Sequence, residues 1–315
     1  MPTVLMTAPY MIPFVDRFKP EFAKYAIDLI VPDVQERMEE ADLLRYAGKF
    51  DGTICGDDRY TAKVIEACSP RLKVISKWGT GVDSIDANAC AQFHVKLART
   101  LNAFTTPVAD TVLGYMLAFA RRLPWMNSEM KNGKWEKIPG KTLSECTLGV
   151  IGVGNIGKAV TRRAKAFGMK VYGTDIIAID HVFISETGIE MTTLQSLLSN
   201  SDFVSINCDL NPTSHHLMNS DTFALMKSTA VIINTARGPL IDEQSLIEAL
   251  QAKRLAGAAL DVFEHEPLSL ESPLLKMDNV MLAPHNSNSS PTAWERVHWN
   301  TIRNLVEGLG LEYRD

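Results

Sequence analysis

The sequence predicts an α/β protein with two domains, each built on a doubly wound parallel sheet. Short apolar runs rich in β-branched residues alternate with helical segments along the whole chain. Strands separated by single helices pair in parallel through right-handed crossovers. A glycine-rich turn follows one central strand, and 315 residues are more than a single hydrophobic core usually holds.

The first third of the chain contains the first series of strands. Apolar runs predict strands at residues 3–7, 27–31, 52–55, 73–76 and 94–98. Helical spacing is clearest at residues 33–46 and 60–68. A long helix is predicted over 106–122, because Pro107 suits its first turn and Pro124 ends it.

A second series of strands follows a looser polar segment at residues 127–142. The predicted strands are residues 148–152, 170–174, 203–207, 230–235, 258–261 and 280–283. This number of strands with interleaved helices is what a dinucleotide-binding sheet requires. Residues 292–309 are predicted to form a helix that returns to the first domain, whose boundary we place near residue 99.

The composition excludes several classes of protein. A net charge of −5 leaves no basic footprint for nucleic acid. The apolar runs are shorter than a membrane span, and the N-terminus reads as a strand rather than a signal peptide. Five scattered cysteines without a C-x-x-C pair argue against disulfides and a structural metal site. We therefore expect a cytoplasmic protein that binds neither nucleic acid nor membrane and holds no metal.

The strongest local signal is the turn that contains Gly152, Gly154 and Gly157 in G-x-G-x-x-G spacing. An apolar strand precedes it, and Asn155 and Ile156 begin an amphipathic helix. The first glycine makes the tight turn, the second admits a pyrophosphate, and the third lets the helix pack on the strand. The phosphates would meet the helix N-terminus.

Asp175 ends the next strand and favours NAD over NADP. Its carboxylate can accept hydrogen bonds from a ribose diol and would repel a 2′-phosphate. Two isoleucines follow it, with no arginine to bind such a phosphate. The alternative is that the glycines only make a close turn and that Asp175 is solvated.

Three later strand ends carry charged or titratable residues. Arg237, Glu266 and His285 each follow an apolar strand, and such strand ends line the ligand crevice of a doubly wound sheet. Arginine holds a carboxylate bidentately, and a histidine oriented by a carboxylate exchanges the proton that accompanies hydride. Arg237 as a surface residue, Glu266 in a solvated loop, and His265 as the proton carrier remain open alternatives.

Together these residues resemble the D-isomer-specific 2-hydroxyacid dehydrogenases, and among them most closely the phosphoglycerate dehydrogenases. The resemblance runs from about residue 73 to the helix after His285. Its motifs are Trp78-Gly-Thr-Gly-Val-Asp83, the glycine turn with Asp175, Asn234-Thr-Ala-Arg-Gly238, Leu260-Asp-Val-Phe-Glu-His-Glu-Pro267 and Pro284-His285.

The resemblance implies roles for the matching residues. Arg237 would bind the substrate carboxylate, and His285 would be the general acid in reduction, with Glu266 as its partner. Asp261 would hold the nicotinamide carboxamide. Trp78, Gly79 and Gly81 would contribute to the substrate site. The implied cofactor-binding residues are Thr80, Gly152, Gly154, Asn155, Ile156, Gly157, Asp175, Cys208, Thr235, Ala236 and Asp261.

The resemblance also implies the architecture. It predicts two flavodoxin- or Rossmann-like domains with a cleft between them. Residues 1–98 plus 287–315 would form a discontinuous substrate-binding domain, and residues 99–286 the NAD-binding Rossmann domain. Most members of the family are dimers through the cofactor domain, so we expect a homodimer.

The implied function is NAD-dependent interconversion of a small polar D-2-hydroxy acid and its 2-oxo acid. Phosphoglycerate and hydroxypyruvate or glyoxylate are both open as substrates, because Cys55 stands where phosphoglycerate dehydrogenases commonly have an arginine for the phosphate. Arg59 compensates for that arginine, or the substrate carries no phosphate. The alternative function is an NAD(H)-sensing binding protein on the same fold, without physiological turnover.

One departure from the family is the polar run at residues 286–290, directly after His285. Asn288 in this run is a candidate substrate-binding residue, since the run adds hydrogen-bonding capacity near a hydroxyl- or phosphate-bearing substrate. The alternative is a polar hinge loop.

Overall fold

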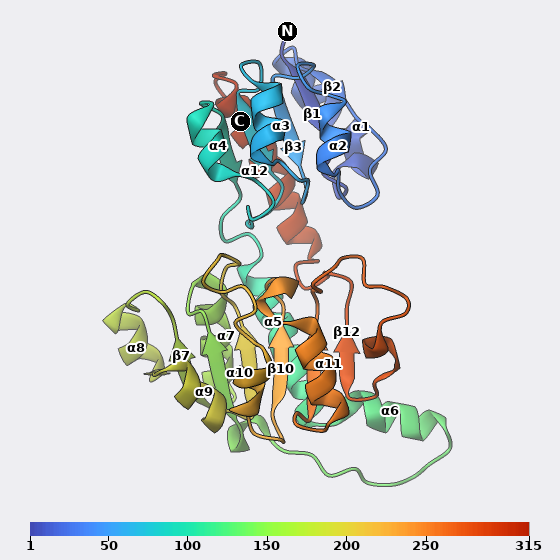
Figure 1. Cartoon of the computed structure of the whole chain (residues 1–315), viewed down its shortest axis with the longest axis vertical. Coiled ribbons are helices and arrows are strands. Elements are labelled where there is room, and N and C mark those ends of the chain that lie inside the picture. The colour runs from blue at the N-terminus through green and yellow to red at the C-terminus, as the bar shows by residue number, and fades with distance from the viewer. Residues whose placement is uncertain (315) are drawn as a thin grey trace. The chain divides into compact units, whose positions relative to one another are not determined.

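The computed structural model describes residues 1–314 and divides into two compact units (Figure 1). Unit 1 comprises Met1–Phe104 and the segment from Ser290 on, and unit 2 comprises Thr105–Ser289. Each unit contains one parallel sheet with helices on both faces. The predicted fold class is therefore confirmed.

Unit 1 has a five-stranded parallel sheet in the order β2-β1-β3-β4-β5, the strand order of flavodoxin-like folds. Its strands are β1 (Thr3–Met6), β2 (Asp28–Ile30), β3 (Gly52–Cys55), β4 (Val74–Lys77) and β5 (Lys96–Arg99). Its helices are α1 (Val15–Lys24), α2 (Glu40–Leu44), α3 (Ala62–Cys68), α4 (Ala87–Gln92) and α12 (Pro291–Gly308), with a short 3-10 turn η1 (Ile12–Phe14).

The two faces of the unit 1 sheet are covered by different helices. Buried residues of α2, α3 and α4 pack with one face of the strands. The C-terminal helix α12 packs against β3, β4 and β5, and the hydroxyl of Ser76 donates to the backbone oxygen of Thr301 at 2.8 Å. The return of the last helix to the first domain is thus observed.

Unit 2 has a seven-stranded parallel sheet in the order β12-β11-β10-β9-β6-β7-β8. Numbered within the unit, this is the 3-2-1-4-5-6 order of dinucleotide-binding folds with one further strand. The strands are β6 (Thr147–Ile151), β7 (Lys170–Thr174), β8 (Glu190–Met191), β9 (Phe203–Ile206), β10 (Val231–Asn234), β11 (Gly257–Leu260) and β12 (Val280–Leu282). The strand order reverses between β6 and β9, which is where ligands bind in such sheets.

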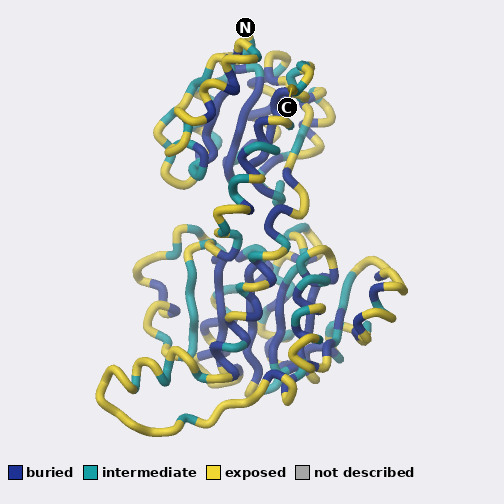
Figure 2. Tube along the Cα trace, turned by 180° about the vertical axis from the view of Figure 1, so that it is seen from behind, coloured by how far each residue is buried: buried dark blue, intermediate teal, exposed yellow. Residues whose placement is uncertain are grey.

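The helices of unit 2 form a layer on each face of the sheet. They are α5 (Thr105–Ala120), α6 (Leu123–Lys131), α7 (Asn155–Ala166), α8 (His181–Thr187), α9 (Leu194–Asn200), α10 (Ser220–Ala224) and α11 (Glu243–Gln251), with 3-10 turns η2 (Leu143–Glu145), η3 (Gly238–Leu240) and η4 (Pro273–Lys276). Val150 packs with α5, α7 and α8, whereas its neighbour Ile151 packs with α9, α10 and α11. Both faces are therefore buried, as the dark blue strands in Figure 2 show. No helix among residues 1–314 is both long and apolar enough to cross a membrane.

The helix predicted at residues 33–46 is shorter than expected, because only Glu40–Leu44 is helical. The Met38 N–H donates to the buried carboxylate of Asp58 at 2.6 Å, so it makes no helical hydrogen bond to the preceding turn. A capping box between Glu39 and Asp42 then starts the helix.

The long helix predicted over 106–122 also ends early. It stops at Ala120, and Arg122 takes a left-handed conformation with φ +57°. Pro124 stands in the first turn of α6, where proline is well tolerated, rather than ending the earlier helix. The loop after α6 is exposed almost throughout and appears as the long yellow segment in Figure 2.

The unit boundaries differ from the predicted residues 98 and 287 by a few positions. The N–H of Thr100 donates to the oxygen of Gly79 at 2.8 Å, so the segment after β5 stays with unit 1 up to Phe104. Ser287 donates its N–H to Asp261 in unit 2, which keeps residues 287–289 with that unit. Local hydrogen bonding therefore decides where each unit ends.

Candidate active site

The glycine turn joins β6 to α7, and each glycine meets a different constraint. Gly152 has φ +85°, and a Cβ on it would lie 2.6 Å from the backbone nitrogen of Cys208. A Cβ on Gly157 would lie 2.0 Å from the oxygen of Gly152. By contrast, nothing lies within 4 Å of the Cβ position of Gly154. The turn is therefore closely packed at its ends and open at its middle glycine.

Asp175, directly after β7, is held beside this turn. One carboxylate oxygen accepts the N–H of Val153 at 2.7 Å, and the other accepts the N–H of Ile177 at 3.1 Å. The carboxylate is thus fixed by backbone groups on two sides. Ile176 and Ile177 next to it are 87% and 66% exposed, so an apolar surface adjoins the carboxylate.

These features fit a dinucleotide. The N-terminus of α7 has no side-chain cap and no acidic residue in its first turn, as a phosphate-binding helix requires. The open space at Gly154 admits a pyrophosphate, and Asp175 supplies a fixed acceptor for a ribose hydroxyl. The predicted cofactor contacts of Gly152, Gly154, Asn155, Ile156 and Gly157 are compatible with this geometry and stay predictions.

The segment between β10 and α11, residues 235–242, carries Arg237 and is called the arginine loop. The buried side chain of Asn234 holds it in shape. The Asn234 amide donates to the backbone oxygen of Arg237 at 2.8 Å, and its oxygen accepts the N–H of Ala236 at 3.1 Å. The Arg237 guanidinium donates to the oxygen of Ala236 at 2.8 Å. Asn234 belongs to a motif quoted from the sequence, but its loop-forming role becomes visible only in the structure. An asparagine at the end of an apolar strand is the sequence signal that would have indicated it, because its side chain readily bonds to the backbone a few residues on.

Thr235 is the first residue of the arginine loop. Cys208 lies next to the glycine turn, at Gly152. The Thr235 side chain is 7% exposed, and its hydroxyl has no hydrogen-bond partner among residues 1–314. Burial raises the pKa of Cys208 to about 11, so its thiol is protonated at neutral pH. Their contacts with the cofactor, like that of Ala236, stay predictions.

Gly238 brings the arginine loop against the loop after β11. A Cβ on Gly238 would lie 1.7 Å from the backbone oxygen of Phe263 and 2.5 Å from the nitrogen of Glu264. Only glycine permits this approach. The arginine loop and the loop that carries Glu266 are therefore in direct backbone contact.

Glu266 and His285 form a hydrogen-bonded pair. One Glu266 oxygen lies 3.0 Å from Nδ1 of His285, and the other accepts the N–H of Phe263 at 3.0 Å. The two side chains are 23% and 24% exposed, so both are accessible. With Nδ1 engaged by the carboxylate, Nε2 is the ring nitrogen at which proton exchange with a ligand would occur. His265, the alternative proton carrier, is exposed.

The turn that carries His285 is anchored by Asp261. His285 has φ +50°, and its N–H donates to the backbone oxygen of Asp261 at 2.7 Å. The fully buried Asp261 carboxylate accepts the N–H groups of Asn286 at 2.6 Å and Ser287 at 2.9 Å. Burial raises the pKa of Asp261, and these N–H groups oppose the effect. Both oxygens are thus engaged by the turn, and the predicted carboxamide contact of Asp261 stays a prediction.

The polar run after His285 makes hydrogen bonds within itself and to the start of α12. Ser289 donates its N–H to the oxygen of Asn286 at 3.0 Å, and its hydroxyl contacts the Asn286 side chain. Ser290 caps α12 by accepting the N–H of Ala293. These contacts favour the hinge-loop interpretation of the run, and substrate binding by Asn288 stays a prediction.

In unit 1, the predicted substrate-binding motif lies after β4. The Trp78 side chain is only 3% exposed, and its indole N–H donates to Nδ1 of His298 at 3.0 Å. Gly79 has φ +116°, and Thr80 donates its hydroxyl to the oxygen of Thr100 at 2.8 Å. The indole and Gly79 are thus buried in unit 1, Thr80 and Gly81 are half-buried, and Asp83 is the exposed residue of the motif. Its contacts with ligands stay predictions.

Comparison with known proteins agrees with this geometry. The family model "D-isomer specific 2-hydroxyacid dehydrogenase, NAD binding domain" matches residues 113–287. A glyoxylate reductase of Thermofilum pendens is 36% identical, over 94% of this chain and 91% of that protein. A D-3-phosphoglycerate dehydrogenase of Methanocaldococcus jannaschii is 38% identical, over 85% of this chain but only 50% of its own length.

Solved structures share the whole fold. The crystal structure of a D-lactate dehydrogenase from Aquifex aeolicus, complexed with NAD and lactic acid, has a TM-score of 0.85 and 26% identity. The alignment covers 97% of this chain and 96% of that one. With an NAD-binding family model over more than half of its length, the chain belongs to the D-isomer-specific 2-hydroxyacid dehydrogenases and is an NAD-dependent oxidoreductase.

Proposed function

We propose that this enzyme reduces a small polar 2-oxo acid to the D-2-hydroxy acid with NADH, and catalyses the reverse reaction. The observation that carries the proposal is the Glu266–His285 pair, 3.0 Å apart, in which the loop that carries Glu266 packs against the arginine loop. Bound NADH supplies the hydride that goes to the carbonyl carbon of the substrate. The residues of the chain have to bind the acid and deliver one proton.

The proton is assigned to His285. In reduction, Nε2–H of the imidazolium donates its proton to the carbonyl oxygen as that oxygen gains charge. Glu266 at Nδ1 holds the ring orientation and stabilises the imidazolium, while Arg237 binds the substrate carboxylate bidentately. In oxidation, neutral His285 takes the hydroxyl proton instead. The alternative of an NAD(H) sensor without turnover leaves this proton-transfer pair without a use.

Among substrates, we propose glyoxylate or hydroxypyruvate over a phosphorylated acid. In unit 1, Cys55 is fully buried, and the buried ammonium of Lys77 is paired with Asp57 at 3.1 Å. The Lys77 ammonium is thus already neutralised by Asp57 and is a poor partner for a phosphate.

The test is NADH oxidation, followed by absorbance, with glyoxylate, hydroxypyruvate and 3-phosphohydroxypyruvate. We expect turnover with the first two and a smaller kcat/KM with the third. Arg237→Ala should lower kcat/KM by roughly 10- to 100-fold, because a charge-assisted pair with the carboxylate is lost. Full turnover without the arginine would show that Arg237 is not the carboxylate ligand.

A pair of matched variants tests the assignment of the proton carrier. His285→Asn should lower kcat by roughly 10²- to 10⁴-fold, since general acid catalysis is lost. Asparagine tolerates the positive φ at this position, so the turn should be kept. NADH binding, measured by fluorescence, should persist. His265→Asn should leave kcat near that of wild type. A larger loss of kcat in His265→Asn than in His285→Asn would assign the proton to His265.

Cofactor preference tests the role of Asp175. We expect NADH to exceed NADPH in kcat/KM, because the carboxylate binds the ribose diol and repels a 2′-phosphate. Asp175→Asn keeps one acceptor oxygen for one of the two local N–H groups and removes the charge, so it should narrow the preference for NADH over NADPH by about tenfold. A wild-type enzyme that prefers NADPH would contradict this assignment.

We also propose a homodimer that forms through α6 and the loop after it. Leu123, Met130 and Trp135 on this segment are 51%, 51% and 87% exposed, an apolar surface typical of an interface. Trp135→Ser should shift the sedimentation coefficient toward that of a monomer. Leu270→Ser, at an equally exposed site elsewhere in unit 2, serves as the control. A monomeric wild type would contradict the proposal.

A cytoplasmic location is proposed from the cysteines. All five are free thiols, four of them buried, as is usual for a protein kept in a reducing compartment. Fractionation of expressing cells checks this, and recovery of the chain mainly from the medium or the membranes would contradict it.

A further inference from the structure

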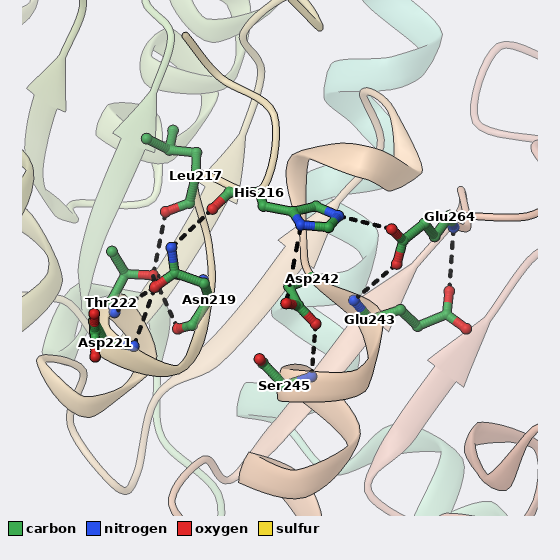
Figure 3. Close-up of polar contacts among 9 residues, drawn as sticks. All are labelled: His216, Leu217, Asn219, Asp221, Thr222, Asp242, Glu243, Ser245 and Glu264. Carbon is green, nitrogen blue, oxygen red and sulfur yellow. Dashed lines mark hydrogen bonds and ion pairs between the residues drawn. The ribbon is translucent and has the colours of Figure 1, made fainter. Parts of the chain in front are cut away.

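A polar cluster outside the proposed catalytic pair joins His216, Asp242, Glu243 and Glu264 (Figure 3). Nε2 of His216 lies 2.7 Å from a Glu264 oxygen, and Nδ1 lies 3.9 Å from a carboxylate oxygen of Asp242. The His216 ring also stacks on that of His215, with centroids 4.0 Å apart. None of these residues has a role in the reaction described above. We refer to the four as the His216 cluster.

Glu264 is the most constrained member of the cluster. Its second carboxylate oxygen accepts the N–H of Glu243 at 3.2 Å, and its own N–H donates to the Glu243 carboxylate at 3.2 Å. Glu243 is the first residue of α11, so the Glu264 carboxylate faces the positive end of a helix. Both the backbone and the side chain of Glu264 are therefore tied down, as Figure 3 shows.

The His216 cluster lies where three loops of unit 2 meet. His216 belongs to the loop after β9, and its N–H donates to the oxygen of Pro239 in the arginine loop at 2.8 Å. Asp242 and Glu243 end the arginine loop and start α11. Glu264 lies in the loop after β11, two residues before Glu266. The cluster thus links the loops that carry Cys208, Arg237 and Glu266.

We propose that His216 and Glu264 are positioning residues, which hold the loop after β11 so that Glu266 stays in contact with His285. This inference rests on the proposed function. The side chains of His216 and Glu264 are 33% and 26% exposed, so solvent screens their pair only in part and the pair also contributes to stability. A displacement of about 1 Å in a catalytic group, however, can cost a rate on the order of 100-fold. We therefore expect the pair to contribute to kcat beyond its contribution to folding.

The first test compares two variants with two controls in NADH-dependent turnover. Glu264→Gln keeps the shape of the side chain but removes its charge, and His216→Asn tolerates the φ of +49° at that position but is too short to reach Glu264. Both should lower kcat by about tenfold, with the KM for NADH changed less than about twofold. His94→Asn, the same change at an exposed residue with φ +56°, and Glu186→Gln, which removes an exposed ion pair with Arg162, should leave kcat unchanged.

A double-mutant cycle separates positioning from a general loss of structure. If Glu264 acts through Glu266, Glu264→Gln should lower kcat no further than about twofold once Glu266→Gln is present. Fully additive losses would overturn the proposal. So would a lower melting temperature with kcat unchanged, since that pattern belongs to a purely structural cluster.

A crystal structure of Glu264→Gln supplies a readout that does not depend on turnover. The separation of 3.0 Å between Glu266 and Nδ1 of His285 should lengthen, and an unchanged pair would overturn the proposal. If the pair moves in the variant but wild type turns over no 2-oxo acid, the positioning role stands and the proposed function fails.

Discussion

The buried carboxylate of Asp261 and the turn after β12 depend on each other. Asp261 receives three consecutive backbone N–H groups, from His285 on its carbonyl oxygen and from Asn286 and Ser287 on its side chain. An unpaired carboxylate at this depth would be costly, so the turn has to close around it. Once closed, this turn holds His285 in a left-handed conformation, which residues other than glycine rarely adopt.

The same sheet edge explains why the other groups lie close to this turn. β10, β11 and β12 are neighbours in the sheet, and Arg237, Glu266 and His285 follow them in that order. The carboxyl ends of parallel strands lie at one edge of the sheet, so three residues far apart in sequence are placed at that edge. The backbone approach at Gly238 then closes the distance between the first two loops. The geometry of the proposed site is thus set by the strand order and by the lack of a side chain at Gly238.

Much of the fold was predictable because its signals are local. The buried strands of both units are continuous apolar runs, and the glycine turn has the spacing that close packing of helix and strand demands. The helix predicted at residues 33–46 was too long, because the bond from Met38 to Asp58, which takes up the Met38 N–H before the helix starts, is not local in sequence. Pro124 was misjudged for a related reason: proline ends one helix or begins the next, and only the path of the chain decides which.

The sequence by itself determined the family, the cofactor and the set of residues at the strand ends, because those depend on residue types at short spacing. The tertiary structure alone decided which histidine meets a carboxylate: His285 pairs with Glu266, while His265, flanked by two glutamates in sequence, points to solvent. It also placed Glu264 with His216 and joined three loops there. Such contacts link residues up to 48 positions apart, and their formation depends on sheet order and loop packing, which no local pattern encodes.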